Sequence, residues 1–537
     1  MIRLQQVKIA LGEPKTQKEM EQQQLMQLEK KIRSLLGLKN PQDLIGWSIV
    51  KRSLDARNKP QLFYQYIIDA EVKREDKVLA GCKHKHAERI EQKEYCFPIS
   101  RKPGKLRPVV VGTGPAGLFC GYFLAKYGYR PILLERGKEV ERRQEDVEQF
   151  WKTGELNPES NVQFGEGGAG TFSDGKLNTL VKEKHGRNRE VLRIFVKHGA
   201  PANILYDSKP HIGTDILRLV IRRMREQILA WGGEVRFQTR MDELIFSEKK
   251  ITGVRLSNGE ILETDAVVLA VGHSARDTFK MCLDKGISME AKPFAVGYRV
   301  EHPQKLIDQG QYGASCMRCL PAAAYKLALK SDSGRGVYSF CMCPGGYVVN
   351  ASSEPGRLAV NGMSYSGRNG KNANSAILVS VSPEDFPGTG PLAGVEFQRQ
   401  LEERAYRLGT GKIPVQYYKD FKGKSEHNLS IESGFHPEMK GDYVFAQVKD
   451  ILPEKLNAVF LQGMEYFHRL IPGFADDYAC ISGVESRTSS PVRIHRDEWG
   501  QATIRGLYPC GEGAGYAGGI TSAAMDGIFI AEMLAKG

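Results

Sequence analysis

Three glycines with the spacing G-x-G-x-x-G could bring the backbone close to a diphosphate. Gly112 permits a tight turn, Gly114 lets the backbone approach the phosphates, and Gly117 lets the following helix pack closely on a sheet. A helix that begins at this turn presents free N–H groups and a partial positive charge. The spacing predicts a dinucleotide site, to which Pro115 and Ala116 also belong.

An acidic residue follows these glycines at the end of the next expected strand. The carboxylate of Glu135 suits the hydroxyls of an adenosine ribose better than a 2′-phosphate. Glu135 and its neighbour Arg136 are therefore assigned to the same dinucleotide site.

The C-terminal segment 506–527, GLYPCGEGAGYAGGITSAAMDG, decides between NAD and FAD. It resembles the last flavin motif of FAD-dependent oxidoreductases of the glutathione-reductase superfamily. The resemblance implies that Gly511 and Glu512 lie at the ribityl–phosphate stretch, and that Gly519 and Ile520 begin a helix aimed at the flavin. A helix N-terminus stabilises the negative charge of a reduced flavin, so FAD is the predicted cofactor.

Two further segments resemble the same superfamily. Residues 233–246, with Met241, resemble the strand that contacts the adenine, and residues 264–272 resemble the strand that returns to the nucleotide at Gly272. No second dinucleotide fingerprint with a terminal acid follows, so NADH or NADPH, as an alternative electron donor, would bind transiently at the flavin.

Several loops of this chain closely resemble a bacterial family of uncharacterised FAD-dependent dehydrogenases. The resemblance covers essentially the whole chain and is carried, besides the C-terminal motif, by residues 164–177, 211–215, 272–276, 339–346 and 483–491. It implies an α/β fold in which an FAD-binding Rossmann-type, doubly wound domain holds an inserted α+β substrate domain.

Glycine is unusually frequent in residues 167–171. Backbone N–H groups at Gly168, Gly170 and Thr171 are predicted to approach the pyrophosphate or flavin, the alternative being a plain surface turn.

Two residues are the candidates for catalysis. His211 has the ordinary pKa of a base near neutrality, about 6.5, and Arg487 could anchor a substrate carboxylate or sit in a structural ion pair with a residue such as Glu485. Lys176 and His273 are secondary candidates. Thr214 or Asp215 is either part of the catalytic cluster or the N-cap of a helix over 216–230.

The ten cysteines are scattered, as expected for thiols kept reduced in a cytoplasm. Cys316, Cys319, Cys341 and Cys343 could form a zinc site, but C-x-C is poor zinc spacing, and no metal is predicted. A dithiol partner of the flavin is disfavoured because only Cys120 lies in the first FAD helix.

Positioning these residues requires three units. A strand at 108–111, a helix at 118–127 and a strand at 131–134 begin the FAD-binding domain, which we expect at 106–290 and 480–537, with a substrate or cap domain at 291–479. Residues 1–104 are expected to form a separate ferredoxin-like α+β domain. Its predicted βαββαβ elements are strand 2–11, helix 15–36, strands 45–54 and 62–72, helix 85–90 and strand 94–99.

Charge suggests an alternative function. The net charge is +13, and residues 1–104 hold 21 Lys and Arg against 13 Asp and Glu. A basic group at Lys51, Arg52, Arg57 and Lys59 makes an RNA-associated or RNA-modifying flavoprotein the alternative, although nucleic acid is not favoured as a partner on charge alone.

The composition, with 41% hydrophobic and 26% charged residues, is that of a folded globular protein. No apolar run reaches the length of a membrane span, and a cytoplasmic location is expected. The leading prediction is an FAD-dependent oxidoreductase, a dehydrogenase or reductase, that acts on a small anionic molecule by hydride transfer at the flavin. A third alternative keeps FAD as a structural or sensory ligand.

Overall fold

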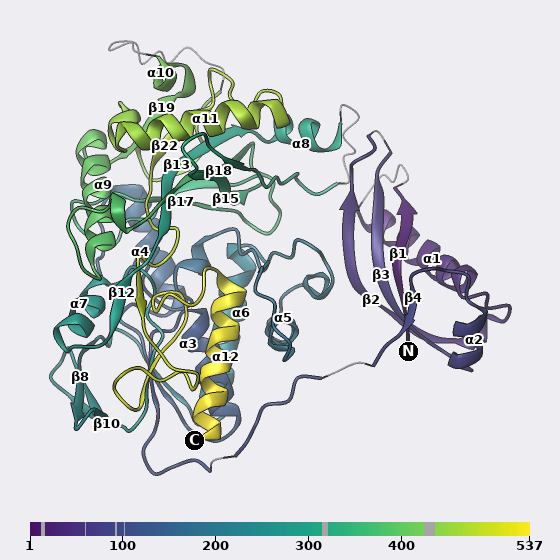
Figure 1. Ribbon diagram of the computed structural model, residues 1–537, viewed down its shortest axis with the longest axis horizontal. Helices are drawn as coiled ribbons and strands as arrows, with labels where there is room; N and C mark the ends of the chain where they lie inside the picture. The colour runs from purple at the N-terminus through teal and green to yellow at the C-terminus, as the bar shows by residue number, and fades with distance from the viewer. Residues whose placement is uncertain (12–16, 60, 92–93, 101, 314–319, 424–434) are drawn as a thin grey trace.

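Three sheets of different construction form the framework of the computed structural model: a parallel sheet, a seven-stranded mixed sheet and a four-stranded antiparallel sheet. The structure describes residues 1–11, 17–59, 61–91, 94–100, 102–313, 320–423 and 435–537. Figure 1 shows the four-stranded sheet set to one side of the two larger ones.

The parallel sheet has the strand order β24-β11-β5-β6-β7. Its strands are β5 (Val109–Val111), β6 (Ile132–Leu134), β7 (Glu234–Arg236), β11 (Val267–Leu269) and β24 (Leu507–Pro509). Four of the five strands are continuous runs of buried residues, mostly valine and leucine, as expected for a sheet covered on both faces. The predicted α/β fold class is confirmed.

Helices cover one face of this sheet, and Figure 1 shows two of them side by side. They are α3 (Pro115–Lys126), α5 (Arg187–Lys197), α6 (Thr214–Ala230) and α12 (Ile520–Lys536). Helices α3 and α12 approach closely at Gly527 because this residue has no side chain. A Cβ at this position would lie 2.1 Å from the Ala116 carbonyl oxygen. This contact joins the two predicted flavin motifs, which are about 400 residues apart in sequence.

A small sheet and one helix cover the opposite face. The elements are β8 (Met241–Ser247), β9 (Lys250–Leu256), β10 (Ile261–Glu263) and α7 (Arg276–Asp284). Along β5, Val110 packs under the helices while Val109 and Val111 pack under the small sheet. The alternation of side chains along a strand thus supplies both cores.

The seven-stranded sheet has the order β14-β15-β18-β13-β22-β19-β21. Its strands are β13 (Phe294–Pro303), β14 (Ala328–Lys330), β15 (Gly336–Cys343), β18 (Asn372–Val381), β19 (Ile413–Tyr417), β21 (Tyr443–Phe445) and β22 (Cys480–Glu485). Helices of this part of the chain are α8 (Gln304–Tyr312), α9 (Ala393–Gly409), α10 (Tyr418–Lys422) and α11 (Glu454–Leu470). We call this sheet with its helices the insert.

The predicted resumption of the FAD-binding domain at residue 480 needs correction. Strand β22 pairs with β13 and β19 and so belongs to the insert sheet. The chain returns to the parallel sheet only with β24, after the short ribbon of β12 (Met289–Ala291) and β23 (Val492–Ile494). Local hydrophobicity does not reveal which of two sheets a buried strand joins.

The remaining elements lie between these layers or at their edges. They are α4 (Val140–Thr153) and the sheet β17-β16-β20, formed by β16 (Tyr347–Asn350), β17 (Val360–Met363) and β20 (Met439–Lys440).

The N-terminal sheet has the order β2-β3-β1-β4, the arrangement of a ferredoxin-like fold. Its elements are β1 (Ile2–Ala10), α1 (Gln17–Leu35), β2 (Leu44–Asp55), β3 (Phe63–Val72), α2 (Glu75–Gly81) and β4 (Ala87–Arg89). The predictions of a helix at 85–90 and of a strand at 94–99 are wrong. Helix α2 follows β3 directly, and β4 comes after α2, before residue 94. Residues 94–100 have no regular secondary structure and pack on α3 and α12, where Phe97 stacks on Tyr127 and the Tyr95 hydroxyl donates to Glu532.

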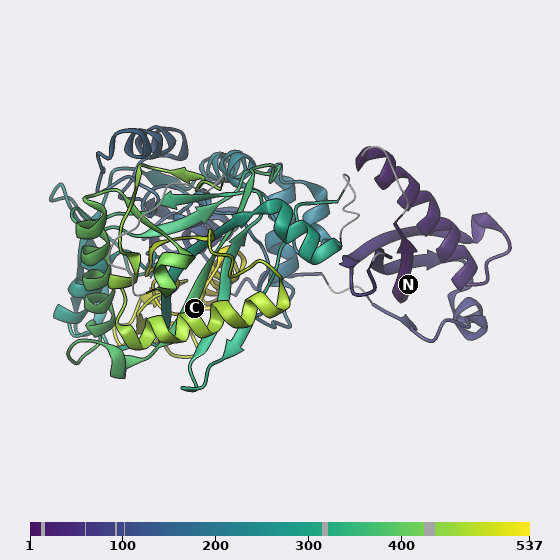
Figure 2. The same cartoon turned by 90° about the horizontal axis from the view of Figure 1, so that it is seen from above.

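Strand β2 fastens this N-terminal unit to the rest of the chain. Arg52 makes an ion pair of 2.7 Å with Asp207, and its backbone N–H donates to the Tyr206 carbonyl oxygen. Lys59 Nζ donates to the Gly310 carbonyl oxygen, and Arg57 pairs with Asp55. Three of the four basic residues that suggested RNA binding therefore have partners within the chain. Apolar contacts add to this attachment, since Leu62 belongs to the buried cluster of the insert and Leu54 packs against it. Figure 2 shows the N-terminal unit beside the larger part of the molecule.

Within the described ranges, none of the helices combines the length and apolar character needed to cross a membrane.

Candidate functional site

A cavity lies at the carboxyl ends of β5, β6 and β11, the edge at which open α/β sheets bind ligands. One side, the nucleotide wall, comes from segments 111–116, 134–136, 270–275 and 512–523. The other side, which we call the insert wall, comes from the insert, from β17 and from the segment after β22. Its residues are Phe340, Cys341, Asn361, Gly362, Glu485, Arg487 and Thr488. The cavity therefore joins the predicted nucleotide site to the insert.

Each of the three fingerprint positions is glycine for a different structural reason. Gly112 has a φ of +100°, and a Cβ there would lie 2.6 Å from the Ala270 carbonyl oxygen. A Cβ at Gly117 would lie 1.9 Å from the Gly112 carbonyl oxygen. Gly114 precedes α3 with an ordinary φ of −66° and lines the cavity, so a side chain there would enter the ligand space. Gly112 and Gly117 shape the turn, and Gly114 keeps it open.

Glu135 ends β6 and borders the cavity, and it also holds neighbouring loops together. One carboxylate oxygen accepts hydrogen bonds from the Thr113 N–H and hydroxyl, at 3.0 and 2.7 Å. The other accepts from the N–H groups of Gly137 and Gly165, at 3.0 and 3.1 Å. The sequence predicted a ribose ligand but not this structural role.

Arg143 shapes the glycine-rich loop, and sequence reasoning missed it. Its guanidinium is fully buried and donates to the carbonyl oxygens of Asn161, Val162, Gly165, Glu166 and Gly168, at 2.6 to 3.2 Å. Burial lowers its pKa to about 10. An arginine on an amphipathic helix is ordinarily read as a solvent-facing residue, so the sequence held no signal for this role.

A buried carboxylate, that of Glu166, supports the same glycine-rich loop. The Glu166 carboxylate accepts from the Val140 N–H at 2.8 Å and pairs with Arg225 at 3.0 Å. Burial nevertheless raises its pKa to about 7.

The nucleotide wall fits FAD by two independent observations. A Cβ at Gly272, Gly518 or Gly519 would meet no atom within 4 Å, so these glycines leave a cradle open on the cavity side. His273 is 7% exposed, lines the cavity, and has an Nε2 atom without a partner among the described residues. Its Nδ1 lies 3.3 Å from the Glu512 carboxylate. A polar atom without a partner, in a residue that lines the cavity beside an open cradle, is what a bound dinucleotide would complete.

Most of the predicted cofactor residues line this cavity. They are Gly112, Gly114, Pro115, Ala116, Glu135, Arg136, Gly168, Gly170, Met241, Gly272, Glu512, Gly519 and Ile520. Three others lie behind its wall: Gly117 in α3, Thr171 with its hydroxyl toward the Glu166 carbonyl oxygen, and Gly511 packed on Ala116.

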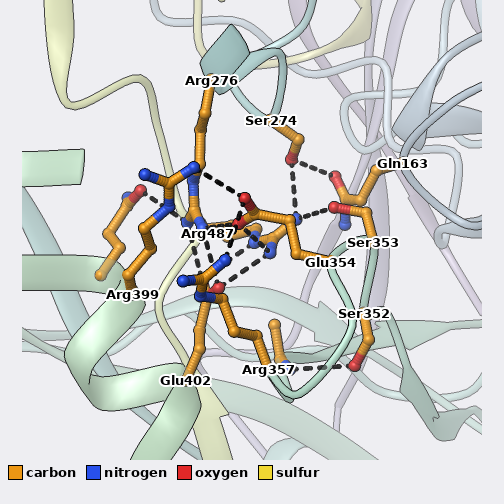
Figure 3. A network of polar contacts seen from close by, with 12 residues as sticks. Gln163, Ser274, Arg276, Ser352, Ser353, Glu354, Arg357, Arg399, Glu402 and Arg487 are labelled. Carbon is orange, nitrogen blue, oxygen red and sulfur yellow. Dashed lines mark hydrogen bonds and ion pairs between the residues drawn. The ribbon is translucent and has the colours of Figure 1, made fainter. Parts of the chain in front are cut away.

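Arg487 lines the cavity but is held in a buried network (Figure 3). Its Nε and one terminal nitrogen donate to Glu402 at 2.9 and 2.8 Å. The other terminal nitrogen donates to the hydroxyls of Ser274, at 3.1 Å, and Ser353. The predicted partner Glu485 pairs instead with Arg299, at 2.8 Å.

A second arginine shares the same carboxylate. Arg276 donates to both oxygens of Glu402, at 2.8 and 3.0 Å, and also pairs with Glu354, which contacts Arg399 at 2.8 Å. Burial alone would raise the pKa of Glu402, but the guanidinium groups of Arg276 and Arg487 outweigh it and hold that pKa well below its usual value. Figure 3 shows these side chains converging from α7, α9 and the loop after β22.

Arg299 organises the insert wall in a comparable way. This fully buried guanidinium donates to the Cys341 carbonyl oxygen and the Asn361 side chain, both at 2.8 Å, besides its ion pair with Glu485. Three cavity-lining residues thus depend on one side chain that the sequence did not single out.

His211 lies behind the cavity wall and does not line it. Its Nε2 is 3.3 Å from the Ser366 carbonyl oxygen, and its backbone bridges that of Lys176. Burial and, secondarily, Arg368 lower its pKa, so the ring is neutral at neutral pH.

The residues next to His211 do not cap helix α6. Gly213 occupies the cap position; the Thr214 hydroxyl donates to the Ser173 carbonyl oxygen, and the Asp215 carboxylate accepts from Ser366.

The cysteine alternatives gain no support. Across the described residues, no group of three or more His, Cys, Asp or Glu side chains could hold a metal ion. Cys341 and Cys343 are free thiols, and Cys316 and Cys319 lie outside the described residues. Cys120 is buried in α3, and burial raises its pKa well above the usual value.

Comparisons with known proteins decide the family. Residues 293–488 match the family described as FAD-dependent protein, C-terminal domain-like, and residues 110–140 match an NAD(P)-binding Rossmann-like domain. Residues 1–71 match a domain of unknown function. An uncharacterized protein of Clostridium beijerinckii is 46% identical over 520 residues, which cover 94% of this chain and 95% of that protein.

The chain belongs to the same family as this Clostridium beijerinckii protein, a family of FAD-dependent proteins. FAD is the cofactor of this flavoprotein.

Solved structures resemble the flavoprotein over most of its length. L-proline dehydrogenase from P. horikoshii is 14% identical, with 81% of this chain and 94% of that chain covered and a TM-score of 0.35. Glycine oxidase from Bacillus cereus is 12% identical, with 80% and 95% covered and a TM-score of 0.31.

Proposed function

We propose that the flavoprotein oxidises or reduces a small anionic molecule by hydride transfer between that molecule and FAD. The observation that carries the proposal is the shared cavity: the nucleotide wall and the insert wall line one space. Bound FAD supplies a two-electron acceptor or donor at this space. The fingerprint and the C-terminal motif also support the predicted relationship to the glutathione-reductase superfamily.

The segments 106–290 and 486–537 are proposed to form the FAD-binding domain, with the insert as the substrate domain. Gly114, Gly168 and Gly272 would let the cofactor approach the backbone, and His273 would give its free Nε2 to the cofactor. The N-terminus of α12, preceded by Gly518 and Gly519, would stabilise negative charge on the flavin ring.

In the oxidation direction, the substrate loses a hydride to FAD and a proton to a base. We propose His211 for the base, since its neutral ring donates Nε2–H to the Ser366 carbonyl oxygen and leaves Nδ1 to accept a proton. His211 does not line the cavity, so the proton would reach it through an intervening water.

The test is anaerobic incubation of the FAD-loaded protein with NADH, NADPH and a panel of small acids. Reduction is measured as the loss of flavin absorbance. We expect at least one acid to bleach the flavin. Bleaching by NADH or NADPH alone would identify a reductase with a transient nicotinamide donor. If no donor reduces the flavin, the proposed function is wrong and the structural or sensory alternative is favoured.

His211→Asn tests the base. The variant should retain FAD and reduce it about 10²-fold more slowly with the identified donor, the usual scale for losing a general base. His185→Asn, in an exposed turn, is the matched control and should react at the parent rate. An unchanged rate in His211→Asn would remove this residue from the reaction.

A further inference from the structure

We propose that Lys176, and not Arg487, binds the substrate, and that the group it binds is a carboxylate. This inference rests on the proposed function, because it identifies which cation of the shared cavity is free to hold an anion. It also narrows the substrate class from small anions to small carboxylic acids.

The cavity is lined by four lysine or arginine side chains in the described part of the chain, and three of them are occupied. Arg136 pairs with Glu159 and Asp277, and Arg240 pairs with Glu159 and Asp242. Arg487 is bound to Glu402 through two hydrogen bonds. An arginine saturated by a buried carboxylate has no donor pair left for a second carboxylate.

Lys176 is different. Its ammonium makes one ion pair with a described residue, at 3.9 Å to Asp174, and no hydrogen bond to any described residue. That carboxylate is already bound through both oxygens by Arg368. Asp174 therefore neutralises Arg368 and leaves the charge of Lys176 largely uncompensated.

Further positive charge lies near Lys176. Burial lowers the pKa of Lys209, and Lys176 and Arg368 lower it further by repulsion. Lys176 and Arg368 thus share one carboxylate, Asp174, and Lys209 adds a further positive charge near both. A partly enclosed site with such an excess of positive charge favours an anionic ligand.

The backbone holds Lys176 in place on the cavity wall. Its bridge to His211 is flanked by hydrogen bonds from Leu177 N–H to the Pro210 carbonyl oxygen, at 2.9 Å, and from Ile212 N–H to the Gly175 carbonyl oxygen, at 3.1 Å. The Lys176 side chain is 33% exposed, and the same cavity is lined by Phe340 of the insert and by Gly519 before α12. One ammonium without a hydrogen-bond partner among the described residues, in a cavity that an aromatic side chain also lines, suits a single carboxylate on a small, partly apolar molecule.

The experiment measures binding of simple carboxylates to the FAD-loaded protein without turnover. Acetate and benzoate are titrated while the visible flavin spectrum is recorded, with acetamide and benzamide as neutral probes of the same shape. The parent protein should bind at least one carboxylate more tightly than its amide. Lys176→Met should raise the dissociation constant of that carboxylate at least tenfold and leave the amide unchanged.

Two further variants serve as controls. Lys182→Met removes an exposed lysine six residues along the chain and should bind like the parent, and Lys176→Arg should keep most of the affinity. If Lys176→Met does not fold, Lys176→Gln takes its place.

Unchanged carboxylate affinity in the folded Lys176 variant overturns the inference, as does the absence of carboxylate binding to the parent. Either result leaves the proposed function standing if a donor still reduces the flavin. A protein that binds carboxylates at Lys176 but is reduced by no donor contradicts the proposed function alone.

Discussion

The two walls of the cavity are built by different means. The nucleotide wall depends mainly on backbone: glycines that admit close approach and a helix N-terminus, set by short runs of adjacent residues. The insert wall depends on buried charges, with Arg276 and Arg487 sharing Glu402, and Arg299 paired with Glu485. A backbone cradle is local in sequence, whereas an ion-pair network is assembled from distant segments.

The difference sets how each wall should fail. A side chain added to the nucleotide wall should block the ligand and leave the fold intact. Loss of Glu402, behind the insert wall, should remove the carboxylate that two buried arginines share and destabilise the whole protein.

The largest effect is expected for Glu402→Gln. The change leaves Arg276 and Arg487 without their shared charge, and breaking a buried pair in this way costs about 3–5 kcal/mol. Chemical denaturation measures the free energy of unfolding. The control is Glu403→Gln, the next residue of α9, whose side chain is 41% exposed and pairs with Arg357; its loss should be below about 1 kcal/mol. If Glu402→Gln lost as little free energy of unfolding as the control, the network would not be structurally important.

Gly114→Leu should reduce FAD affinity at least ~10²-fold, or about 3 kcal/mol, because the side chain would occupy the ligand space. The free energy of unfolding of the apoprotein should change little, since φ at this position is ordinary. Reconstitution of the apoprotein with FAD measures the affinity. Gly46→Leu, in β2 with open space around its Cβ, is the control and should bind FAD normally. Normal binding by the Gly114 variant would place the phosphates elsewhere.

Arg143→Met tests whether the nucleotide wall also depends on a buried charge. Five carbonyl oxygens would lose their donor, so we expect a loss of roughly 2–3 kcal/mol in the free energy of unfolding and weaker FAD binding. The neighbouring Arg142→Met, with a side chain that is 64% exposed, should change neither quantity appreciably. A variant with parent affinity for FAD would restrict the nucleotide wall to its glycines.

Glu301 is a buried carboxylate of the insert that, unlike Glu402, has no cationic hydrogen-bond partner among the described residues. It accepts from the Glu438 N–H at 2.9 Å and the Asn372 amide at 3.2 Å, yet burial raises its pKa from 4.5 to about 8. Between these values the folded state binds the extra proton, so stability falls as pH rises from about 4.5 to 8.

Glu301→Gln should therefore gain stability relative to the parent as pH rises through this window, by on the order of 1 kcal/mol per pH unit. Denaturation at several pH values measures the difference. Glu263→Gln, exposed on β10, is the control and should show no such trend above pH 6. A constant difference between Glu301→Gln and the parent would show that Glu301 is ionised in the folded protein.

Sequence reasoning reached the nucleotide wall because its signals are local. The residues that indicate the turn 112–117 and those that indicate the start of the helix after Gly519 each lie within about ten positions. Gly112 and Gly117 also have a direct steric reason. In the N-terminal unit the βαββαβ order was predictable, but its last helix and strand were misplaced, since short exposed elements have weak periodicity.

The sequence alone determined that the chain binds a dinucleotide and uses FAD, because glycine turns and helix starts work through their own backbone. Only the tertiary structure decided the state of each charge. It bound Arg487 to a glutamate 85 residues away, enclosed Arg143 in a ring of carbonyl oxygens, and left Lys176 without a hydrogen bond to a described residue. The physical reason is that the free energy of a charged side chain depends on its burial and its partners, and these are set by packing between segments far apart in sequence.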